Sequence, residues 1–195
     1  MLKRLFDITA SFLGLLILSP FLLILALAIV SESKGGVFYM QTRVGKNNKD
    51  FKLFKFRSMA QGSDKKGLLT IGNDSRITKV GRFIRNYKLD EFAQLINVLK
   101  GDMSLVGPRP EVRKYVDLYT EEQLNVLNVK PGITDYASIE YFDENKILGA
   151  ADNPEKTYIE EVMPHKLELN KKYINRPNLL HDIKLIFRTF QKIIK

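Results

Sequence analysis

The chain has 195 residues, 45% of them hydrophobic and 27% charged, which is ordinary for a folded protein and argues against a disordered one. Its 31 Lys and Arg against 22 Asp and Glu give a formal net charge of +9, which suits nucleic acid, anionic lipid head groups or phosphorylated small molecules. It has no cysteine and two histidines, so disulfides, thiol chemistry and cysteine-ligated zinc are excluded. Any metal should be a hard cation held by carboxylates and phosphates.

The first predicted element is an apolar run near the N-terminus. Residues 8–30 carry no charge, and as a helix they would measure roughly 35 Å, enough to cross a bilayer core of about 30 Å. Hydropathy alone therefore favours a straight transmembrane helix. Pro20 opposes this, because it removes a backbone donor and clashes with the preceding turn, while Ser19 can bond its hydroxyl back to that turn.

Basic residues flank both ends of this run: Lys3 and Arg4 before it, then Lys34, Arg43, Lys46 and Lys49 after it. The positive-inside tendency would keep both flanks in the cytoplasm. We therefore predict that residues 1–33 form a re-entrant helix–break–helix membrane hairpin with Ser19 and Pro20 at its apex. This monotopic anchor would hold residues 34–195, a small catalytic domain, on the cytoplasmic side.

The domain after the anchor is predicted to be α-rich α+β with few strands and amphipathic surface helices. Residues 37–41 and 51–57 are typical of strands joined by the turn GKNNKD, and the polar residues 60–76 indicate a loop. Residues 103–111 predict a strand leading into a turn, and residues 129–135, VKPGITD, a turn. Apolar periodicity and stop signals predict helices over residues 77–87, 89–102, 111–128, 153–173 and 179–195. The last helix is basic and amphipathic, which suits a membrane surface.

Two adjacent acids, Asp90 and Glu91, lie at the start of the helix predicted over residues 89–102. Acids at a helix start usually cap it and complement its dipole, and this structural interpretation stays open. Neighbouring residues lie about 100° apart on a helix, so the two carboxylates would not share one substrate atom. They could instead divide the work, with one attacking and the other holding a cation. A helix N-terminus stabilises an ionised aspartate, which helps it act as a nucleophile.

Basic residues in the surrounding sequence exceed what a core needs: Lys55, Arg57, Arg82, Arg85 and Arg109. Phosphate binding would use them, and a solvated or lipid-facing surface is the alternative. In GPRP (107–110), two prolines hold Arg109 in a rigid turn, which favours an anion contact. No phosphate-cradling glycine loop supports an NTPase or an oxidoreductase, and the basic residues match no nucleic-acid module, so no nucleic-acid partner is expected.

Four features occur in a specific order: the membrane run broken at Ser19-Pro20, QTRVGKNNKDFKLFKFRSM (41–59), NDSRITKVGRFIRNYKLDEFAQLINVLKGDMSLVGPRP (73–110) and KPGITDYAS (130–138). Together they cover nearly the whole chain. In this order and spacing the chain resembles the bacterial sugar transferase family, the monotopic polyprenyl-phosphate phosphoglycosyl transferases. Its length resembles the minimal members, which carry only the catalytic domain.

The resemblance implies a two-step transfer at the cytoplasmic face of the bacterial cytoplasmic (inner) membrane. Asp90 would attack the β-phosphorus of a UDP-sugar, release UMP and carry the phosphosugar, and undecaprenyl phosphate would then take it. Glu91 would help hold Mg²⁺ against the diphosphate. The phosphate-binding candidates are Lys55, Arg57, Arg85 and Arg109. The product would initiate a membrane-linked glycan: a capsule, O-antigen, exopolysaccharide or glycoprotein glycan. Expected partners are the UDP-sugar donor, the undecaprenyl phosphate acceptor and membrane lipid, with a homodimer left open.

Two stretches depart from the family pattern. The acidic pair is followed by FAQ (92–94), where the family commonly has Leu-Pro-Gln, and little consequence is expected. After the Pro-Gly-Ile-Thr turn, Asp135 replaces a common glycine, and Glu140 and Phe142 stand where an arginine is usual. That region is expected to touch the donor, so an altered contact with the sugar or the nucleotide is expected, and the sugar itself is not specified.

Two other functions compete with this interpretation. A membrane-associated glycosyltransferase would move the sugar alone and release UDP, so the nucleotide product separates the two enzymes. A basic membrane-anchored scaffold would bind anionic lipid or a protein partner. Salt would abolish that binding, and replacement of Asp90 by asparagine would leave it intact. The concentration of motif residues around Asp90 favours the phosphosugar transferase over the scaffold.

Overall fold

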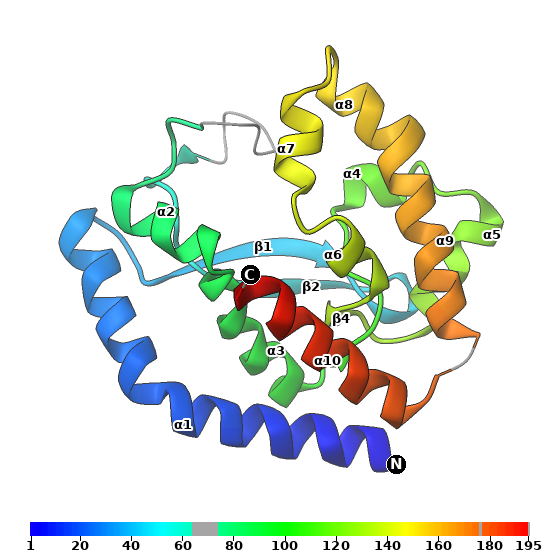
Figure 1. The fold of residues 1–195 in the computed structure, drawn as a ribbon, viewed down its shortest axis with the longest axis horizontal. Coiled ribbons are helices and arrows are strands. Elements are labelled where there is room, and N and C mark those ends of the chain that lie inside the picture. The colour runs from blue at the N-terminus through cyan, green and yellow to red at the C-terminus, as the bar shows by residue number, and fades with distance from the viewer. Residues whose placement is uncertain (64–73, 176, 195) are drawn as a thin grey trace.

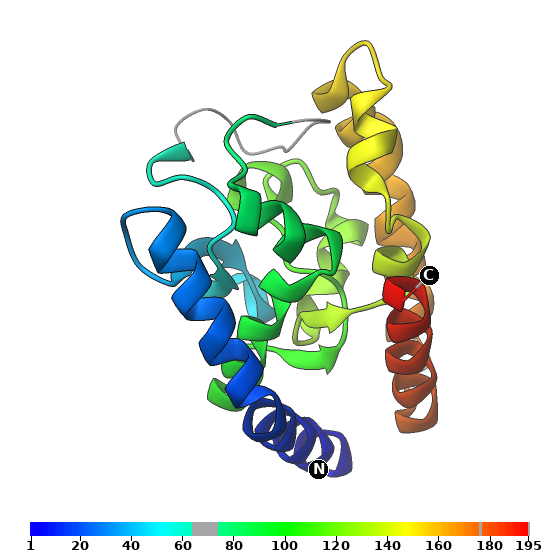
Figure 2. The same ribbon diagram turned by 60° about the vertical axis from the view of Figure 1, so that its left-hand side comes forward.

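The computed structural model describes residues 1–63, 74–175 and 177–194. Helices make up most of this part of the chain, and its named strands form two small sheets of two strands each (Figure 1). Seen from the side, the long N-terminal helix and the last helices lie on opposite flanks of the domain, with the first sheet between them (Figure 2). The α-rich α+β class predicted from the sequence is therefore confirmed.

Helix α1 (Leu2–Glu32) is one helix of 31 residues that contains Pro20. The ribbon bends part-way along, so that its two halves run in different directions (Figure 1). Ser19 Oγ donates to the carbonyl oxygen of Leu16 at 2.8 Å, the back-bond expected beside a proline that removes a donor. The predicted break is thus a bend within a continuous helix rather than a folded-back hairpin. Re-entry into a membrane stays a prediction.

One side of α1 packs on the domain and the other is exposed. The buried Leu22, Leu25 and Ile29 share a core cluster with Phe56 and Ile84. In the described residues α1 is the one helix long and apolar enough to cross a membrane, by length and composition only, and just 11% of its most apolar window is buried. So much exposed apolar surface favours a lipid contact over the core of a soluble protein. The division into an anchor and a catalytic domain stays a prediction.

The predicted hairpin is present as two antiparallel strands, β1 (Phe38–Val44) and β2 (Asp50–Phe56). β1 ends three residues later than the sequence predicted, and the register places Tyr39 opposite Lys55. The turn contains a short 3₁₀ segment, η1 (Lys46–Asn48), in which Asn47 and Asn48 both have a positive φ. Asparagine tolerates this left-handed conformation better than most residues, which explains the turn.

Helix α2 (Lys79–Asn86) matches the predicted helix over residues 77–87. Its N-terminus is capped by Thr78, whose Oγ1 accepts a hydrogen bond from the backbone N–H of Gly81 at 2.9 Å. Most of the predicted loop over residues 60–76 lies outside the described residues. An antiparallel bridge between Met59 and Ile77 joins the described residues on either side of that stretch.

The helix predicted over residues 89–102 begins as a 3₁₀ turn, η3 (Leu89–Ala93), and continues as α3 (Gln94–Lys100). It ends at Gly101, where the sequence predicted a stop, and the φ of 92° there is the left-handed conformation that glycine adopts most readily. The tighter first turn holds the acidic pair.

The second sheet joins β3 (Ser104–Val106) to β4 (Gly132–Thr134) in parallel. The prediction of a turn over VKPGITD is therefore wrong at Gly132–Thr134, which form a strand. A Cβ on Gly132 would lie 2.1 Å from the backbone nitrogen of Gly107, so the two backbones approach this closely only because both residues are glycine. The partner strand lies far away in sequence, and local composition could not reveal the pairing.

The single helix predicted over residues 111–128 is wrong. The segment forms three short pieces: α4 (Arg113–Val116), α5 (Glu121–Leu124) and η4 (Asn125–Asn128). Thr120 and Gln123 make a reciprocal capping box that starts α5 anew, because each side chain satisfies the backbone N–H of the other. Two further short helices, which the sequence did not predict, follow β4: α6 (Tyr136–Glu140) and α7 (Glu144–Gly149).

The C-terminal part is helical, as predicted. α8 (Pro154–Thr157), a π turn labelled η5 (Tyr158–Val162) and α9 (Met163–Ile174) form one run, and α10 (Leu179–Ile194) ends the described chain. The hydroxyl of Tyr173 donates to Asp182 Oδ1 at 2.8 Å and lies 3.1 Å from the carbonyl oxygen of Val106. This buried tyrosine therefore ties α9, α10 and β3 together.

Candidate active site

The acidic pair lies in η3. This turn begins directly after Lys88, whose φ of 54° is left-handed. A residue with a side chain adopts this conformation only at a cost of order 1 kcal/mol, so the turn into η3 is strained. Asp90 is buried, with 8% of its surface exposed. Its Oδ2 lies 3.4 Å from the ammonium nitrogen of Lys55, which reaches it from β2. The turn thus presents a buried carboxylate beside a cation.

Glu91 pairs with Arg109, from the GPRP turn, through both carboxylate oxygens. Oε2 accepts from Nη1 at 3.3 Å, and Oε1 accepts from Nη2 in a shorter contact. Lys55 Nζ also lies 3.8 Å from Glu91 Oε1. Such a two-pronged contact fixes both side chains better than a single bond does. Lys55 therefore bridges the two acids, and Arg109 holds the second one in place.

Burial and charge act in opposite directions on this cluster. Burial alone would raise the pKa of Glu91, but Arg109 and Lys55 outweigh it and lower that pKa to about 2. Burial lowers the pKa of Lys55, and Asp90 and Glu91 oppose the shift. The Glu91 carboxylate raises the pKa of Arg109 against the effect of burial. Glu91 and Arg109 are therefore an ionised pair at neutral pH.

The structure brings three of the four predicted phosphate-binding residues to one cavity, but not the fourth. Lys55, Arg85 and Arg109 line the cavity with the acidic pair. Arg57 is not among the lining residues. Its buried guanidinium donates instead to the carbonyl oxygens of Lys34 at 2.7 Å and Ser33 at 2.8 Å, at the C-terminal end of α1. Arg57 follows the last residue of β2, Phe56, so the alternation of side chains along the strand no longer fixes its direction, and it turns towards α1.

The cavity has a volume of about 500 Å³ and two kinds of wall. One wall is charged, with six basic residues against four acidic ones: Arg43, Lys55, Arg85, Lys88, Arg109 and Lys166, with Asp90, Glu91, Glu111 and Glu144. The other wall is apolar and includes residues of α1 and α10, with Leu95 of α3 and Ile133 of β4 among the other apolar lining residues. A pocket of this size with a basic excess on one side fits an amphiphilic or polyanionic ligand.

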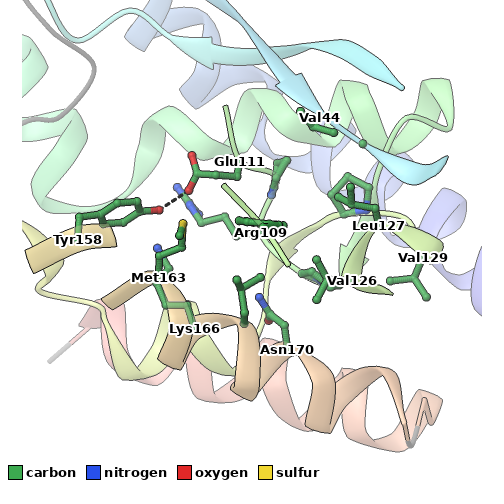
Figure 3. A pocket seen from close by; sticks show the side chains of 16 residues that line it. Val44, Arg109, Glu111, Val126, Leu127, Val129, Tyr158, Met163, Lys166 and Asn170 are labelled. Atoms are coloured by element: carbon green, nitrogen blue, oxygen red, sulfur yellow. Dashed lines mark hydrogen bonds between the residues drawn. The ribbon is translucent and has the colours of Figure 1, made fainter. Parts of the chain in front are cut away.

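Sequence reasoning missed a second polar group on the charged wall, behind the GPRP turn. Glu111 accepts from Arg43 Nη1 at 2.9 Å. It also accepts from the hydroxyl of Tyr158 (Figure 3). Nearby, Lys166 of α9 pairs with Glu144 of α7 at 2.8 Å. Tyr158 and Lys166 also line a small pocket of about 30 Å³, together with Arg109. Arg43 stood in a quoted motif, but no pattern linked it to helices a hundred residues away.

The comparisons with known proteins agree with the resemblance. The family description of the bacterial sugar transferases matches residues 1–195, which is the whole chain. The chain belongs to the bacterial sugar transferase family.

Three relatives show what this sugar transferase is similar to. UDP-N-acetylgalactosamine-undecaprenyl-phosphate N-acetylgalactosaminephosphotransferase of Aeromonas hydrophila is 39% identical over 99% of the chain. UDP-glucose:undecaprenyl-phosphate glucose-1-phosphate transferase of Escherichia coli K12 is 41% identical over 98%. The uncharacterized sugar transferase EpsL of Bacillus subtilis 168 is 40% identical over 99%. The first two names differ in their sugar, so similarity at this level does not select one.

The lengths of these relatives differ. The chain spans 44% of the Aeromonas protein and 40% of the Escherichia coli protein, but 87% of the Bacillus subtilis protein. The similarity to the two longer proteins therefore covers less than half of each of them.

Asp135, which stands where the resemblance leads us to expect a glycine, has a defined structural role. It is fully buried, and its Oδ1 accepts from the backbone N–H of Ser138 at 2.6 Å, which caps α6. Its Oδ2 accepts from the backbone N–H of Arg109 at 3.0 Å. One carboxylate therefore joins the helix start after β4 to the arginine that holds Glu91. Asp135 therefore supports the backbone of Arg109 at the candidate site.

Replacing Asp135 by alanine is expected to lower the free energy of unfolding by about 1–2 kcal/mol, because α6 loses its cap and the N–H of Arg109 its partner. Asparagine, which keeps an acceptor oxygen, should lose less. Asp143 is the matched control, since it stands at the N-cap of α7 without a side-chain cap bond. Urea unfolding checks this: equal losses for Asp135→Ala and Asp143→Ala would contradict the role given to Asp135.

The family implies Mg²⁺, and the residues present fit it only together with a phosphorylated substrate. Among the described residues, no group of three or more histidine, aspartate or glutamate side chains is placed to hold a metal ion. Glu91, the predicted metal ligand, can supply one carboxylate next to Asp90. Mg²⁺ commonly binds through one or two carboxylates plus substrate phosphates and water rather than in an all-protein cage. The acidic pair of this sugar transferase therefore suits a metal that arrives with a diphosphate.

Proposed function

We propose that this chain transfers a phosphosugar from a UDP-sugar to undecaprenyl phosphate, releasing UMP, and so initiates a membrane-linked glycan. Membership of the family and the printed activities of the Aeromonas and Escherichia coli relatives support the class of reaction. The observation that carries the proposal is the placement of Asp90. It lies buried beside Lys55, next to the Glu91–Arg109 pair, on the charged wall of a cavity whose other wall is apolar.

In the proposed first step, a carboxylate oxygen of Asp90 attacks the β-phosphorus of the donor. A bond forms between that oxygen and phosphorus, and the bond to the bridging oxygen breaks, so UMP leaves with the bridging oxygen. Lys55, Arg85 and Arg109 would stabilise the charge on the phosphate oxygens. Glu91 would hold Mg²⁺, which when bound neutralises charge on the diphosphate. The ion pair with Arg109 keeps Glu91 ionised for that purpose.

In the proposed second step, a phosphate oxygen of the acceptor attacks the phosphosugar on Asp90. The new phosphorus–oxygen bond completes the polyprenyl-diphosphate sugar, and the bond to Asp90 breaks and restores the carboxylate. The basic side chains that stabilised the first transfer face the same phosphorus and would serve again. Burial of Asp90 limits access by water, which would otherwise hydrolyse the intermediate.

The proposed membrane arrangement rests on contacts at both ends of α1. At the N-terminal end, Arg4 donates to the carbonyl oxygens of Val98 at 2.6 Å and Leu99 at 3.1 Å, at the end of α3. Asp7 accepts from the hydroxyl of Ser104 at 2.9 Å and from the backbone N–H of Leu105 at 3.2 Å. The start of α1 is thus bound to the domain.

At the C-terminal end of α1, Glu32 accepts from the backbone N–H groups of Lys79 at 2.6 Å and Val80 at 2.9 Å, and Arg57 holds the last carbonyls. A helix that crossed the bilayer would carry its two ends to opposite faces and break one set of contacts. Contacts at both ends with one small domain support a monotopic helix that dips into a single leaflet, and the basic residues on both flanks of the apolar run favour the cytoplasmic face.

Cysteine labelling checks this arrangement without background, because the chain has no cysteine. Leu2 and Lys46 are exposed and lie on either side of the apolar run. We expect Leu2→Cys and Lys46→Cys to react with a membrane-impermeant maleimide only in inside-out vesicles, where the cytoplasmic face is outside. Labelling of the two positions from opposite faces would show that α1 spans the bilayer and would contradict the monotopic proposal.

The nucleotide product tests the proposed reaction against its rivals. Purified protein with Mg²⁺, undecaprenyl phosphate and a panel of UDP-sugars should release UMP with at least one sugar, and that sugar would be named by the result. Release of UDP would identify a glycosyltransferase that moves the sugar alone. Release of neither nucleotide, together with salt-sensitive binding to anionic vesicles, would favour the scaffold.

A further inference from the structure

The apolar wall of the cavity is made by two helices from opposite ends of the chain. On α1 the lining residues are Phe6, Ala10, Gly14 and Leu18, each four residues after the last, so they form one stripe on one face of the helix. On α10 the apolar lining residues are Ile186, Phe190 and Ile193, at spacings of four and three. Two helical faces therefore border the same space.

A polar contact joins the two helices at one end, and both helices line the cavity. Lys3, near the start of α1, pairs with the buried Asp182 in the first turn of α10. From there the helices diverge on either side of the domain (Figure 2). Helix α3, which packs on α1, also contributes Leu95 to the lining of the cavity. The result is a slot with apolar sides that leads to the charged wall.

Small residues on α1 keep this slot open. A Cβ built on Gly14 would meet only Leu95 Cδ1 at 3.5 Å, an ordinary contact, so packing of α1 on α3 does not require a glycine there. Ala10 is likewise small and only partly buried. Larger side chains at these two positions would fill the slot.

Both helices carry large exposed apolar residues, which on α10 stand beside the exposed basic residues Lys184 and Arg188. Phe12 and Leu16 of α1 are 56% and 59% exposed, and Leu180 and Phe187 of α10 are 67% and 66% exposed. Exposed apolar surface of this extent marks a contact with lipid or with another chain. If these faces meet the membrane, as the proposed function requires, the slot between the helices opens towards hydrocarbon.

We propose that the slot between α1 and α10 binds the prenyl units next to the phosphate of the acceptor. This inference rests on the proposed function. The charged wall would take the phosphate near Asp90, and the slot would take the chain attached to it, because the two walls belong to one continuous cavity. The rest of the polyprenyl chain would extend into the bilayer. In this proposal α10 forms one side of the acceptor site.

The test compares two acceptors, undecaprenyl phosphate and geranyl phosphate, with the full chain in detergent micelles. The measured quantity is the ratio of their kcat/KM values, which does not depend on the fraction of active protein. Ala10→Leu, which fills the slot, should lower the preference for undecaprenyl phosphate by about tenfold or more. Thr9→Leu is the matched control, because it adds the same side chain to the exposed face one residue away, and its ratio should equal that of the wild type.

Three results would overturn the inference. Equal ratios for Ala10→Leu and Thr9→Leu would show that the chain does not pass between α1 and α10. Competitive inhibition of the wild type by dioleoylphosphatidylglycerol, lost in Ala10→Leu, would assign the slot to phospholipid rather than to the acceptor. Failure of the wild type to transfer phosphosugar to either acceptor would overturn the proposed function and the slot with it, whereas the first two results leave the proposed function standing.

Discussion

Replacement of Asp90 by asparagine is expected to lower the rate of UMP release by at least about 1,000-fold, because an amide cannot form the phosphoryl bond that the proposed first step requires. The change keeps the size of the side chain in a buried position and removes its charge. Lys55 loses one of its two carboxylate partners and keeps Glu91. A steady-state assay of UMP with a responding UDP-sugar measures the effect.

Asp117→Asn provides the control for this prediction. Asp117 is an exposed aspartate that pairs with Arg113 at 3.9 Å and is not among the residues that line the cavity. It should release UMP at the wild-type rate. If Asp90→Asn retained more than about a tenth of that rate, the attack would have to come from another group, and Asp90 would be left as a structural residue of η3.

Replacement of Arg109 by alanine is expected to lower both stability and activity. Glu91 would keep only the more distant Lys55, so a largely buried carboxylate would lose its main partner. Breaking a buried ion pair costs about 3–5 kcal/mol, and about 2–3 kcal/mol is expected here because 31% of the Arg109 side chain is exposed. Loss of a cation that stabilises the transferring phosphate should lower kcat/KM by about 100-fold or more.

Arg109→Lys separates charge from geometry. Lysine keeps the positive charge but cannot make the two-pronged contact with Glu91, so we expect activity between that of the wild type and that of the alanine variant. Arg113→Ala, which removes an exposed arginine paired with Asp50, is the matched control. Urea unfolding and initial rates measure both effects. Near-wild-type rates for Arg109→Ala would show that the arginine only supports the fold.

Much of the candidate site was predictable from the sequence because its residues belong to ordered motifs. The structure brings Lys55, Asp90, Glu91 and Arg109 within a few ångströms of one another, from a strand, a 3₁₀ turn and a proline-flanked turn. The prediction that Arg57 lies with the other phosphate-binding candidates was wrong for a local reason. Alternation predicted a strand over residues 51–57, but β2 ends at Phe56, and nothing local indicated that the side chain of Arg57 meets the end of α1. The chemical roles of these residues stay proposals.

The fold was predicted best where the signal is local. α2, α3 with its stop at Gly101, the hairpin and α10 follow from caps, periodicity and turn residues. β4 was missed because a three-residue strand is defined by its distant partner, and the helix over residues 111–128 failed because a capping box at Thr120 restarts it. The bend of α1 was anticipated at Ser19-Pro20, but its docking on the domain depends on Arg4 and Asp7, whose partners lie about a hundred residues away.

The measurement that tests the central claim most directly is the intact mass of the protein after incubation with Mg²⁺ and a responding UDP-sugar in the absence of acceptor. The account predicts a mass increase equal to one phosphosugar, located on the peptide that contains Asp90, together with one equivalent of UMP. Addition of undecaprenyl phosphate should remove the adduct. UMP formed only when the acceptor is present, with no adduct on the chain, would contradict the covalent mechanism.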